Sequence, residues 1–464
     1  MQMGNSRKHY VAVIGGAVAG VEAAYNLAEQ GYKVVVFDQM MLPYGKIEDG
    51  LPKWHYKLRE KEIAKIDDKI LHENISFVPG VKIGRDVSFE ALTSEWGFSA
   101  VLFATGAWKD RPLNIGNIDD YVNKGLVYQN PLLYWFNHYH EALYDGPMYD
   151  IPDGATVIGG GLASIDVVKL FMIDTVQKAL VKKGIGESMY DLEKKGVTDI
   201  LAKHKLTLEK LGLKGATLIY RRREMDMPLS PRPKTTEKEI ADSQRIALKI
   251  MDKYKKKFLF NYEELSVLED FEVKEDSLSA LIFQKMKIDK NGNLIKDGDK
   301  KLRHETTFLT SSIGSIPELI PGLPTKGVLY DIVDKETSRV AGHRNVFAIG
   351  NTVTGKGNIV TSLKHSKGIT KGIIEAHRLK QSAEMQEAEP KSYVDKFNNI
   401  LRNVEKGVDK QMSSIVDEIE CRDSQSDDLA ELIKSKAKEL QSKVGFDGDY
   451  FAWKEKYRKE RLVA

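Results

Sequence analysis

Two glycine-rich turns, each between an apolar strand and a helix, are the feature that most restricts how this chain can fold. The first turn, residues 15–20, follows an apolar run at 10–14, and the second, residues 159–164, follows a run at 155–158. Such a turn lets backbone N–H groups and a helix N-terminus approach a pyrophosphate without obstruction by side chains. Two copies predict an α/β protein with two Rossmann-like dinucleotide-binding domains.

The charges that follow each turn predict which dinucleotide it binds. The strand at 33–37 ends at Asp38, 18 residues beyond Gly20, and a carboxylate there favours the unphosphorylated ribose of FAD or NAD. The strand at 216–220 leads into three arginines at 221–223, whose guanidinium groups would bind the 2′-phosphate of NADP. Two charged hydrogen bonds of roughly 1.5–3 kcal/mol each would favour NADPH over NADH by roughly a hundredfold or more. The alternative interpretation of these arginines is a solvated strand end.

Composition narrows the class of protein. A chain of 464 residues is too long for one core, and Lys+Arg 70 against Asp+Glu 67 gives no bulk attraction to nucleic acid or to a membrane. No apolar run is long enough to predict a membrane span, so we expect a cytoplasmic protein. Cys421 is the only cysteine, which excludes an intrachain disulfide, a Cys-x-x-Cys redox pair and a cysteine-ligated iron–sulfur cluster. The histidines lack metal-ligand spacing, and we expect no metal site.

Further short motifs lie in a fixed order along the chain. They are Pro43-Tyr44-Gly45-Lys46, Gly50-Leu51-Pro52 with His55, Gly84-Arg85-Asp86-Val87, Ala104-Thr105-Gly106, Gly161-Leu162-Ala163 with Asp166, Tyr220-Arg221-Arg222 with Met227-Pro228, and Gly357-Asn358-Ile359. Over residues 9–375 or so, this arrangement resembles the adrenodoxin reductase and ferredoxin–NADP reductase family. That family is related to the glutamate synthase small subunit within the pyridine-nucleotide disulfide reductase superfamily.

The resemblance implies hydride transfer from NADPH to FAD, then electron transfer to a ferredoxin-like acceptor. The FAD contacts expected from the turns and the resemblance are Gly15, Ala17, Ala19, Gly20, Asp38, Lys46, Ile83, Ala104, Thr105, Gly106, Gly350, Asn351, Gly357, Asn358 and Ile359. The expected NADP contacts are Gly160, Gly161, Leu162, Ala163, Arg221, Arg222 and Glu237. His55 and Asp166 are the candidate catalytic side chains, for handling a proton near the flavin. Asp166 could instead complement the dipole of its helix.

The spacing also predicts the domain organisation. The 62 residues between Gly159 and Arg221 exceed the usual crossover of about 20, and the Lys/Glu/Leu-rich excess at about 175–213 predicts a helical insertion. The polar C-terminal part predicts surface helices, with a flexible segment near 423–428. The expected domains are an FAD-binding domain in two parts, 1–108 and 336–382, an NADP-binding domain at 109–335, and a charged helical extension at 383–464.

Two positions depart from the family pattern and keep alternatives open. Ala17 stands where the family usually has glycine, and Asn351 stands where it usually has Asp or Trp. Decay of the flavin site would make the chain a non-catalytic nucleotide-binding relative. The charged extension instead favours a third possibility, an electron-input subunit of a larger complex similar to the glutamate synthase small subunit.

Overall fold

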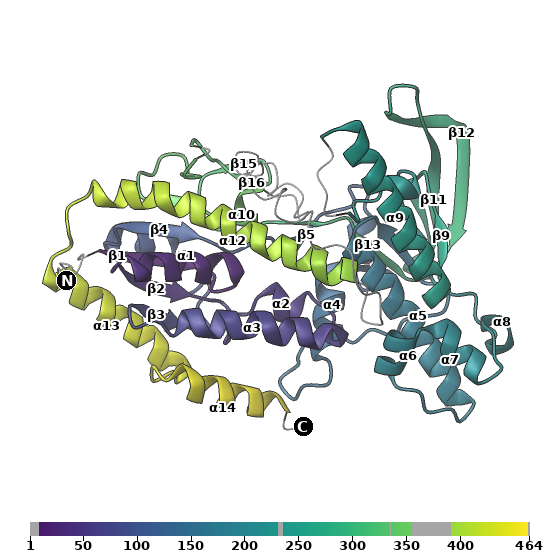
Figure 1. Ribbon diagram of the computed structural model, residues 1–464, viewed down its shortest axis with the longest axis horizontal. Coiled ribbons are helices and arrows are strands. Elements are labelled where there is room, and N and C mark those ends of the chain that lie inside the picture. Colours follow the sequence, from purple (N-terminus) through teal and green to yellow (C-terminus); the bar gives the residue numbers. More distant parts are fainter. Residues whose placement is uncertain (1–8, 231–234, 335, 355–390, 463–464) are drawn as a thin grey trace, which may run out of the picture.

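A computed structural model describes residues 9–230, 235–334, 336–354 and 391–462. It shows two α/β units, each with a five-stranded sheet, followed by three C-terminal helices (Figure 1). The predicted fold class, two Rossmann-like units with a helical C-terminal part, is confirmed. Among the described helices, no helix combines the length and the apolar character needed to cross a membrane.

The first unit is a parallel sheet of order β17-β4-β1-β2-β3. Its central strands are continuous apolar runs, because helices cover both faces of such a sheet. The strands are β1 (Tyr10–Ile14), β2 (Lys33–Phe37), β3 (Ile75–Val78), β4 (Ala100–Phe103) and β17 (Val346–Ala348). The helices are α1 (Val18–Glu29), α2 (Lys46–Asp49), η1 (Lys53–His55), α3 (Tyr56–Ile70), η2 (Ala91–Glu95) and α10 (Asn351–Thr354).

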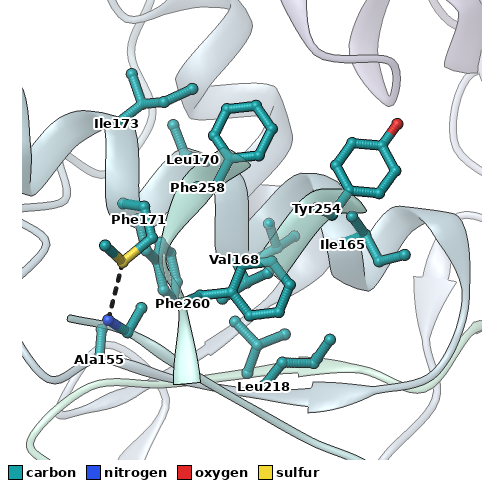
Figure 2. Packing of buried hydrophobic residues seen from close by; sticks show 14 of the residues in the cluster. Ala155, Ile165, Val168, Leu170, Phe171, Ile173, Leu218, Tyr254, Phe258 and Phe260 are labelled. Carbon is teal, nitrogen blue, oxygen red and sulfur yellow. Dashed lines mark hydrogen bonds between the residues drawn. The ribbon is translucent and has the colours of Figure 1, made fainter. Parts of the chain in front are cut away.

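The second unit is a parallel sheet of order β6-β13-β7-β8-β9. In its core, Tyr254 and Phe258 of α9 lie near Ile165 and Val168 of α5 (Figure 2). The strands are β6 (Leu126–Tyr128), β7 (Thr156–Gly159), β8 (Thr217–Ile219), β9 (Asn261–Glu263) and β13 (Leu309–Ser312). The helices outside the insertion are η3 (Ile118–Tyr121), α4 (Gln129–His138), α5 (Leu162–Lys182), η4 (Glu224–Asp226) and α9 (Glu237–Phe258).

The unusually long crossover contains the helices that its composition predicts. After α5 come α6 (Met189–Lys195), α7 (Val197–Lys203) and α8 (Leu208–Leu211). Ser188 and Thr207 cap α6 and α8 by accepting hydrogen bonds from backbone N–H groups. Leu192 and Ile200 are buried in the core of the second unit, so the insertion is part of that core.

Antiparallel strands make up the remainder of the β structure. The turn at 289–293 is held by the Asp289 carboxylate, which accepts hydrogen bonds from the N–H groups of Asn291 and Asn293. The largest antiparallel sheet contains β10 (Ser266–Lys274), β11 (Ser277–Ile288) and β12 (Leu294–Glu305). Two short pairs are β5 (Lys109–Asp110) with β14 (Ser315–Ile316), and β15 (Thr325–Lys326) with β16 (Leu329–Tyr330).

The C-terminal part forms helices, as its polar sequence predicts, and these helices complete the first unit. Helix α12 (Lys391–Glu420) lies along α1, and α13 (Asp427–Val444) and α14 (Tyr450–Leu462) continue around the same unit (Figure 1). Their apolar faces are buried in its core. Gln425, inside the expected flexible segment, is buried and bonds to the Tyr10 N–H and to the Gly97 carbonyl.

Candidate functional site

The first glycine-rich turn is packed so closely that its glycines cannot carry side chains. Gly15 has a φ of +101°, and a Cβ atom there would lie 2.7 Å from the carbonyl oxygen of Ala104. A Cβ atom on Gly20 would lie 1.7 Å from the carbonyl oxygen of Gly15. The turn therefore brings bare backbone to the start of α1, which is the arrangement that a pyrophosphate requires.

Asp38, at the end of β2, contacts this turn directly. One carboxylate oxygen accepts a hydrogen bond from the Gly16 N–H at 2.7 Å, and the other accepts one from the Met40 N–H at 2.8 Å. Burial raises the pKa of Asp38 to about 6, although both hydrogen bonds oppose the shift. The predicted ribose-binding carboxylate thus lies beside the turn and is held at a fixed position.

Two further predicted segments border the first turn. Residues 104–106 follow β4, and the Gly106 N–H donates a hydrogen bond to Thr352 Oγ at 2.9 Å. Gly350 has a φ of +64°, and a Cβ atom there would lie 2.7 Å from the Cβ atom of Ala19. The structure therefore brings these predicted residues together, and Thr352 is a neighbour that the sequence did not indicate.

The structure shows the neighbours of Ala17 and Asn351, the two residues that depart from the family pattern. Ala17 is the N-cap residue of α1, and its methyl group faces Gly45, where a Cβ atom would come within 2.8 Å. The absence of a side chain at Gly45 therefore makes room for the methyl group of Ala17. Asn351 begins α10, and its side-chain oxygen is buried with no hydrogen-bond partner among the described residues. Residues 357–359, also predicted to bind FAD, lie outside the described residues.

Lys46 and Ile83 have other contacts than the sequence suggested. The Lys46 ammonium donates hydrogen bonds to Asn130 Oδ1 at 3.0 Å and to Ser315 Oγ at 3.1 Å, so it ties the first unit to the second. Burial lowers the pKa of Lys46 and raises that of nearby Asp110. The side chain of Ile83 is buried in the core of the first unit.

The second turn is equally crowded on one side and open on the other. A Cβ atom on Gly160 would lie 2.1 Å from the ring of Tyr220, whereas a Cβ atom on Gly161 would meet nothing within 4 Å. Gly161 is the N-cap residue of α5, whose first residues are Leu162 and Ala163. The open side of this turn is therefore where α5 presents its N-terminal N–H groups.

The three arginines after β8 differ in their contacts. Arg223 is committed to Asp226 through two hydrogen bonds of 2.9 and 3.0 Å. Arg222 donates one hydrogen bond to the Gly292 carbonyl at 3.1 Å. Arg221 is exposed and forms no ion pair within the described part of the chain. The Arg222 guanidinium also lies 3.6 Å from Asp226. Arg221 and Arg222 are therefore held less firmly than Arg223 and are better placed to turn toward a phosphate.

Glu237, the remaining predicted NADP contact, is the first residue of α9 and is exposed. The capping box of this helix is formed by Thr236 and Glu239 instead.

His55 and Asp166, the two predicted catalytic side chains, are brought together. His55 ends η1 of the first unit, Asp166 lies on α5 of the second, and His55 Nε2 is 3.5 Å from Asp166 Oδ1. Both side chains are buried. Asp166 lies beyond the first turn of α5, so capping of the helix dipole does not explain its position.

Sequence reasoning missed two charged residues beside this pair. Lys169 Nζ lies 3.2 Å from Asp166 Oδ1 and 3.1 Å from Glu193 Oε1. The spacing Asp-x-x-Lys along a helix places both side chains on one face and was the available signal for Lys169. Glu193 belongs to the inserted helix α6, and no local pattern indicates its partner.

Comparison with known proteins places these features in a family. Residues 9–223 match the family described as pyridine nucleotide-disulphide oxidoreductase. The chain is 32% identical over 166 residues to a probable ferredoxin/ferredoxin--NADP reductase of Mycobacterium leprae, covering 35% of this chain and 28% of the relative. It is 24% identical over 241 residues to the mitochondrial NADPH:adrenodoxin oxidoreductase of Arabidopsis thaliana, covering 49% and 48%. The chain thus matches less than half the length of either relative.

Two further comparisons extend the similarity. A glutamate synthase [NADPH] small chain of Mycobacterium tuberculosis is 34% identical over 105 residues, which cover 22% of this chain and 21% of the relative. The solved structure of Mycobacterium tuberculosis FprA in complex with NADPH superposes with a TM-score of 0.63 at 17% identity, covering 94% of this chain and 91% of that one. Residues 9–223 thus match the pyridine nucleotide-disulphide oxidoreductase family, and the chain shows distant homology to adrenodoxin reductases, ferredoxin–NADP reductases and glutamate synthase small chains.

Proposed function

We propose that this chain is an NADPH-dependent FAD reductase that delivers electrons to a small iron–sulfur protein of the ferredoxin type. The observation that carries the proposal is the pair of dinucleotide turns with opposite charges beside them. Asp38 lies against the first turn, and Arg221 and Arg222 follow the strand beside the second. The names of the relatives, ferredoxin--NADP reductase and NADPH:adrenodoxin oxidoreductase, support the same activity.

The residues of the first unit fit FAD. Gly15 and Gly20 form a cradle that a Cβ atom would fill, and the Asp38 carboxylate is placed to accept hydrogen bonds from ribose hydroxyls. The buried side-chain oxygen of Asn351, without a partner among the described residues, would gain a donor from a bound ligand. In this proposal FAD is held by residues 1–108 and 336–382, and NADP by residues 109–335.

FAD, when bound, would supply the chemistry that takes up two electrons as a hydride and releases them one at a time. The chain's own contribution is to align the two nucleotides, exclude water and manage the accompanying proton. His55 and Asp166 are the candidates for the last task, because an imidazole and a carboxylate 3.5 Å apart need to approach by only a few tenths of an ångström, ~0.3 Å or more, to share a proton. Their burial limits exchange of that proton with bulk solvent.

The lack of a second cysteine favours an external one-electron acceptor. Cys421 is the only cysteine of the chain and is exposed on the C-terminal part. Reduction of a disulfide within this chain is therefore impossible, and electrons would leave directly for a partner. A ferredoxin-like protein is the partner that the named relatives suggest.

The electron-input subunit is a weaker second candidate. Its support came from the charged C-terminal extension, but the helices α12 to α14 contribute buried residues to the core of the first unit. The extension therefore has a structural role that requires no partner subunit. The similarity to a glutamate synthase small chain covers only 22% of this chain.

An anaerobic titration of the purified protein with NADPH tests the proposed function. We expect a yellow protein that is bleached by NADPH, is bleached far less readily by NADH, and is reoxidised by a ferredoxin. A preparation that is colourless and fails to take up added FAD would refute the proposal and favour a non-catalytic relative. Reoxidation only by a co-purifying second polypeptide would favour the electron-input subunit.

A further inference from the structure

Lys169 is a lysine buried in the core of the second unit. It lies on α5, one helical turn beyond Asp166, and its side chain is among the largest that are fully buried. Burying an ammonium group costs several kcal/mol unless it is paired and hydrogen-bonded. An apolar residue at this position would pack without that cost, so the charge calls for an explanation.

The ammonium group is paired with carboxylates from two different elements. Its Nζ atom is 3.2 Å from Asp166 Oδ1 and 3.1 Å from Glu193 Oε1. Burial opposes the charged form of Lys169, but the two carboxylates outweigh it and raise the pKa of the lysine. Lys169 is therefore a permanent cation at neutral pH, and it compensates the charge of Asp166.

The surroundings of this cluster come from two other helices, η1 and α9. Trp54 and His55 come from η1, and the ring of Trp54 lies 5.1 Å from Lys169 Nζ. Tyr254 of α9 lies on another side, 5.4 Å away. Lys257, also on α9, is a second cation near Glu193, and its ammonium donates a hydrogen bond to the Lys194 carbonyl at 2.9 Å.

We propose that Lys169 is a positioning residue that holds the Asp166 carboxylate in its orientation toward the His55 imidazole and offsets the charge of Asp166, with Glu193 of the inserted helix balancing the charge of Lys169. The same Asp166 oxygen, Oδ1, contacts both Lys169 Nζ and His55 Nε2. An ionised carboxylate that is fixed by a cation can accept a hydrogen bond from the imidazole and stabilise its protonated form.

The charge balance explains why both carboxylates are present. Protonated His55 with Lys169, Asp166 and Glu193 makes a set of two cations and two anions, which is neutral overall. Loss of Lys169 would leave the carboxylates of Asp166 and Glu193 without the cation between them, and the set would bind a proton more tightly. Loss of the Glu193 charge would have the opposite effect. The helical insertion, through α6, thus acts on the His55–Asp166 pair.

This inference rests on the proposed function for the role of the pair, but its test does not require bound flavin. The protein has ten histidines, so ¹³C-labelled histidine gives few NMR signals, and His55→Gln identifies the one from His55. We expect Lys169→Met to raise the midpoint of the His55 titration by about one pH unit or more. Lys169→Arg keeps the cation and should leave the midpoint near that of the parent, whereas Glu193→Gln should lower it.

Lys178 provides a matched control on the same helix. It is half-exposed and pairs with Asp150 at 2.6 Å and Asp174 at 2.7 Å, so Lys178→Met removes a comparable lysine away from the pair. Opposite shifts for Lys169→Met and Glu193→Gln, with no shift for Lys178→Met, support the inference. The inference is overturned if the His55 titration midpoints of Lys169→Met and Glu193→Gln coincide with that of the parent. If Lys169→Met does not fold, the midpoint measured in Glu193→Gln decides alone. Failure of the parent protein to be bleached by NADPH would instead overturn the proposed function.

Discussion

Replacing Arg221 and Arg222 together by alanine is expected to lower the preference for NADPH over NADH. The third arginine is a poorer substitute, because Arg223 is held by two hydrogen bonds to Asp226 that it would have to break in order to reorient. Arg222 donates one hydrogen bond to the Gly292 carbonyl and lies 3.6 Å from Asp226, and Arg221 is exposed, so both retain N–H donors for a 2′-phosphate. NADH lacks this phosphate, and its binding should hardly depend on either side chain.

The magnitude follows from the exposure of these side chains. A hydrogen bond to a charged group contributes roughly 1.5–3 kcal/mol when it is shielded from water. The Arg222 side chain is 33% exposed and Arg221 is more open, so solvent screening reduces each contribution to about 1–1.5 kcal/mol. Two such contributions give about 2–3 kcal/mol, which corresponds to a change of about 30- to 150-fold in selectivity.

The assay compares kcat/KM for NADPH and NADH with an artificial electron acceptor, in the parent and in the double variant. Arg303→Ala is the control, because Arg303 is an exposed arginine of β12 with hydrogen bonds of 2.9 and 2.7 Å to Glu272. The double variant should lose kcat/KM for NADPH while its value for NADH stays within about twofold. An unchanged ratio of the two values would refute the charge-based assignment of the second turn.

Three other perturbations have distinct expected outcomes. Gly160→Ala should lower the denaturation midpoint, because the added Cβ atom would lie 2.1 Å from the ring of Tyr220. Gly161→Ala adds a methyl group in open space, so it should leave the denaturation midpoint unchanged and raise KM for NADPH. In the flavin-free protein, folding raises the pKa of Asp38 to about 6. Between about pH 4 and 6 the carboxylate therefore binds more protons in the folded state than in the unfolded state. Stability should therefore fall by up to about 3 kcal/mol as pH rises through this window, and Asp38→Asn should abolish that part of the pH dependence in urea titrations. Arg461→Met should cost about 3 kcal/mol in the same measurement, because it removes the guanidinium that is paired with two largely buried carboxylates, Glu48 and Glu141. A loss below about 1 kcal/mol would contradict this interpretation.

The parts of the fold that follow from local sequence patterns were predictable. A glycine at positive φ between a buried strand and a helix is a local requirement, and Gly15 shows it directly. The residue that ends the following strand must lie beside such a turn, which is why Asp38 could be placed from spacing alone. The pairing of His55 with Asp166 was reachable only through the family resemblance, since the two lie on different units.

Contacts between distant segments were not predictable, because no local pattern encodes them. Gln425 lies in a polar stretch typical of a flexible segment, yet its partners are backbone groups at residues 10 and 97. In the sequence, Lys169 is one more lysine of a predicted helix. Only the structure shows that its ammonium group pairs with the carboxylates of Asp166 and Glu193. The space that Gly45 leaves for the methyl group of Ala17 is likewise visible only in the structure.

The C-terminal helices bear on how any truncation experiment must be interpreted. Trp453 of α14 donates a hydrogen bond to the Met41 carbonyl at 2.8 Å, and Arg461 forms an ion pair of 3.0 Å with Glu48. Both partners belong to the segment that leads from β2 to His55. Removal of these helices would therefore expose apolar core and loosen the segment that presents His55, even with no partner protein involved. Loss of activity on truncation consequently supports neither a docking role nor a subunit role, and the point variants that leave the helices in place are the ones that discriminate.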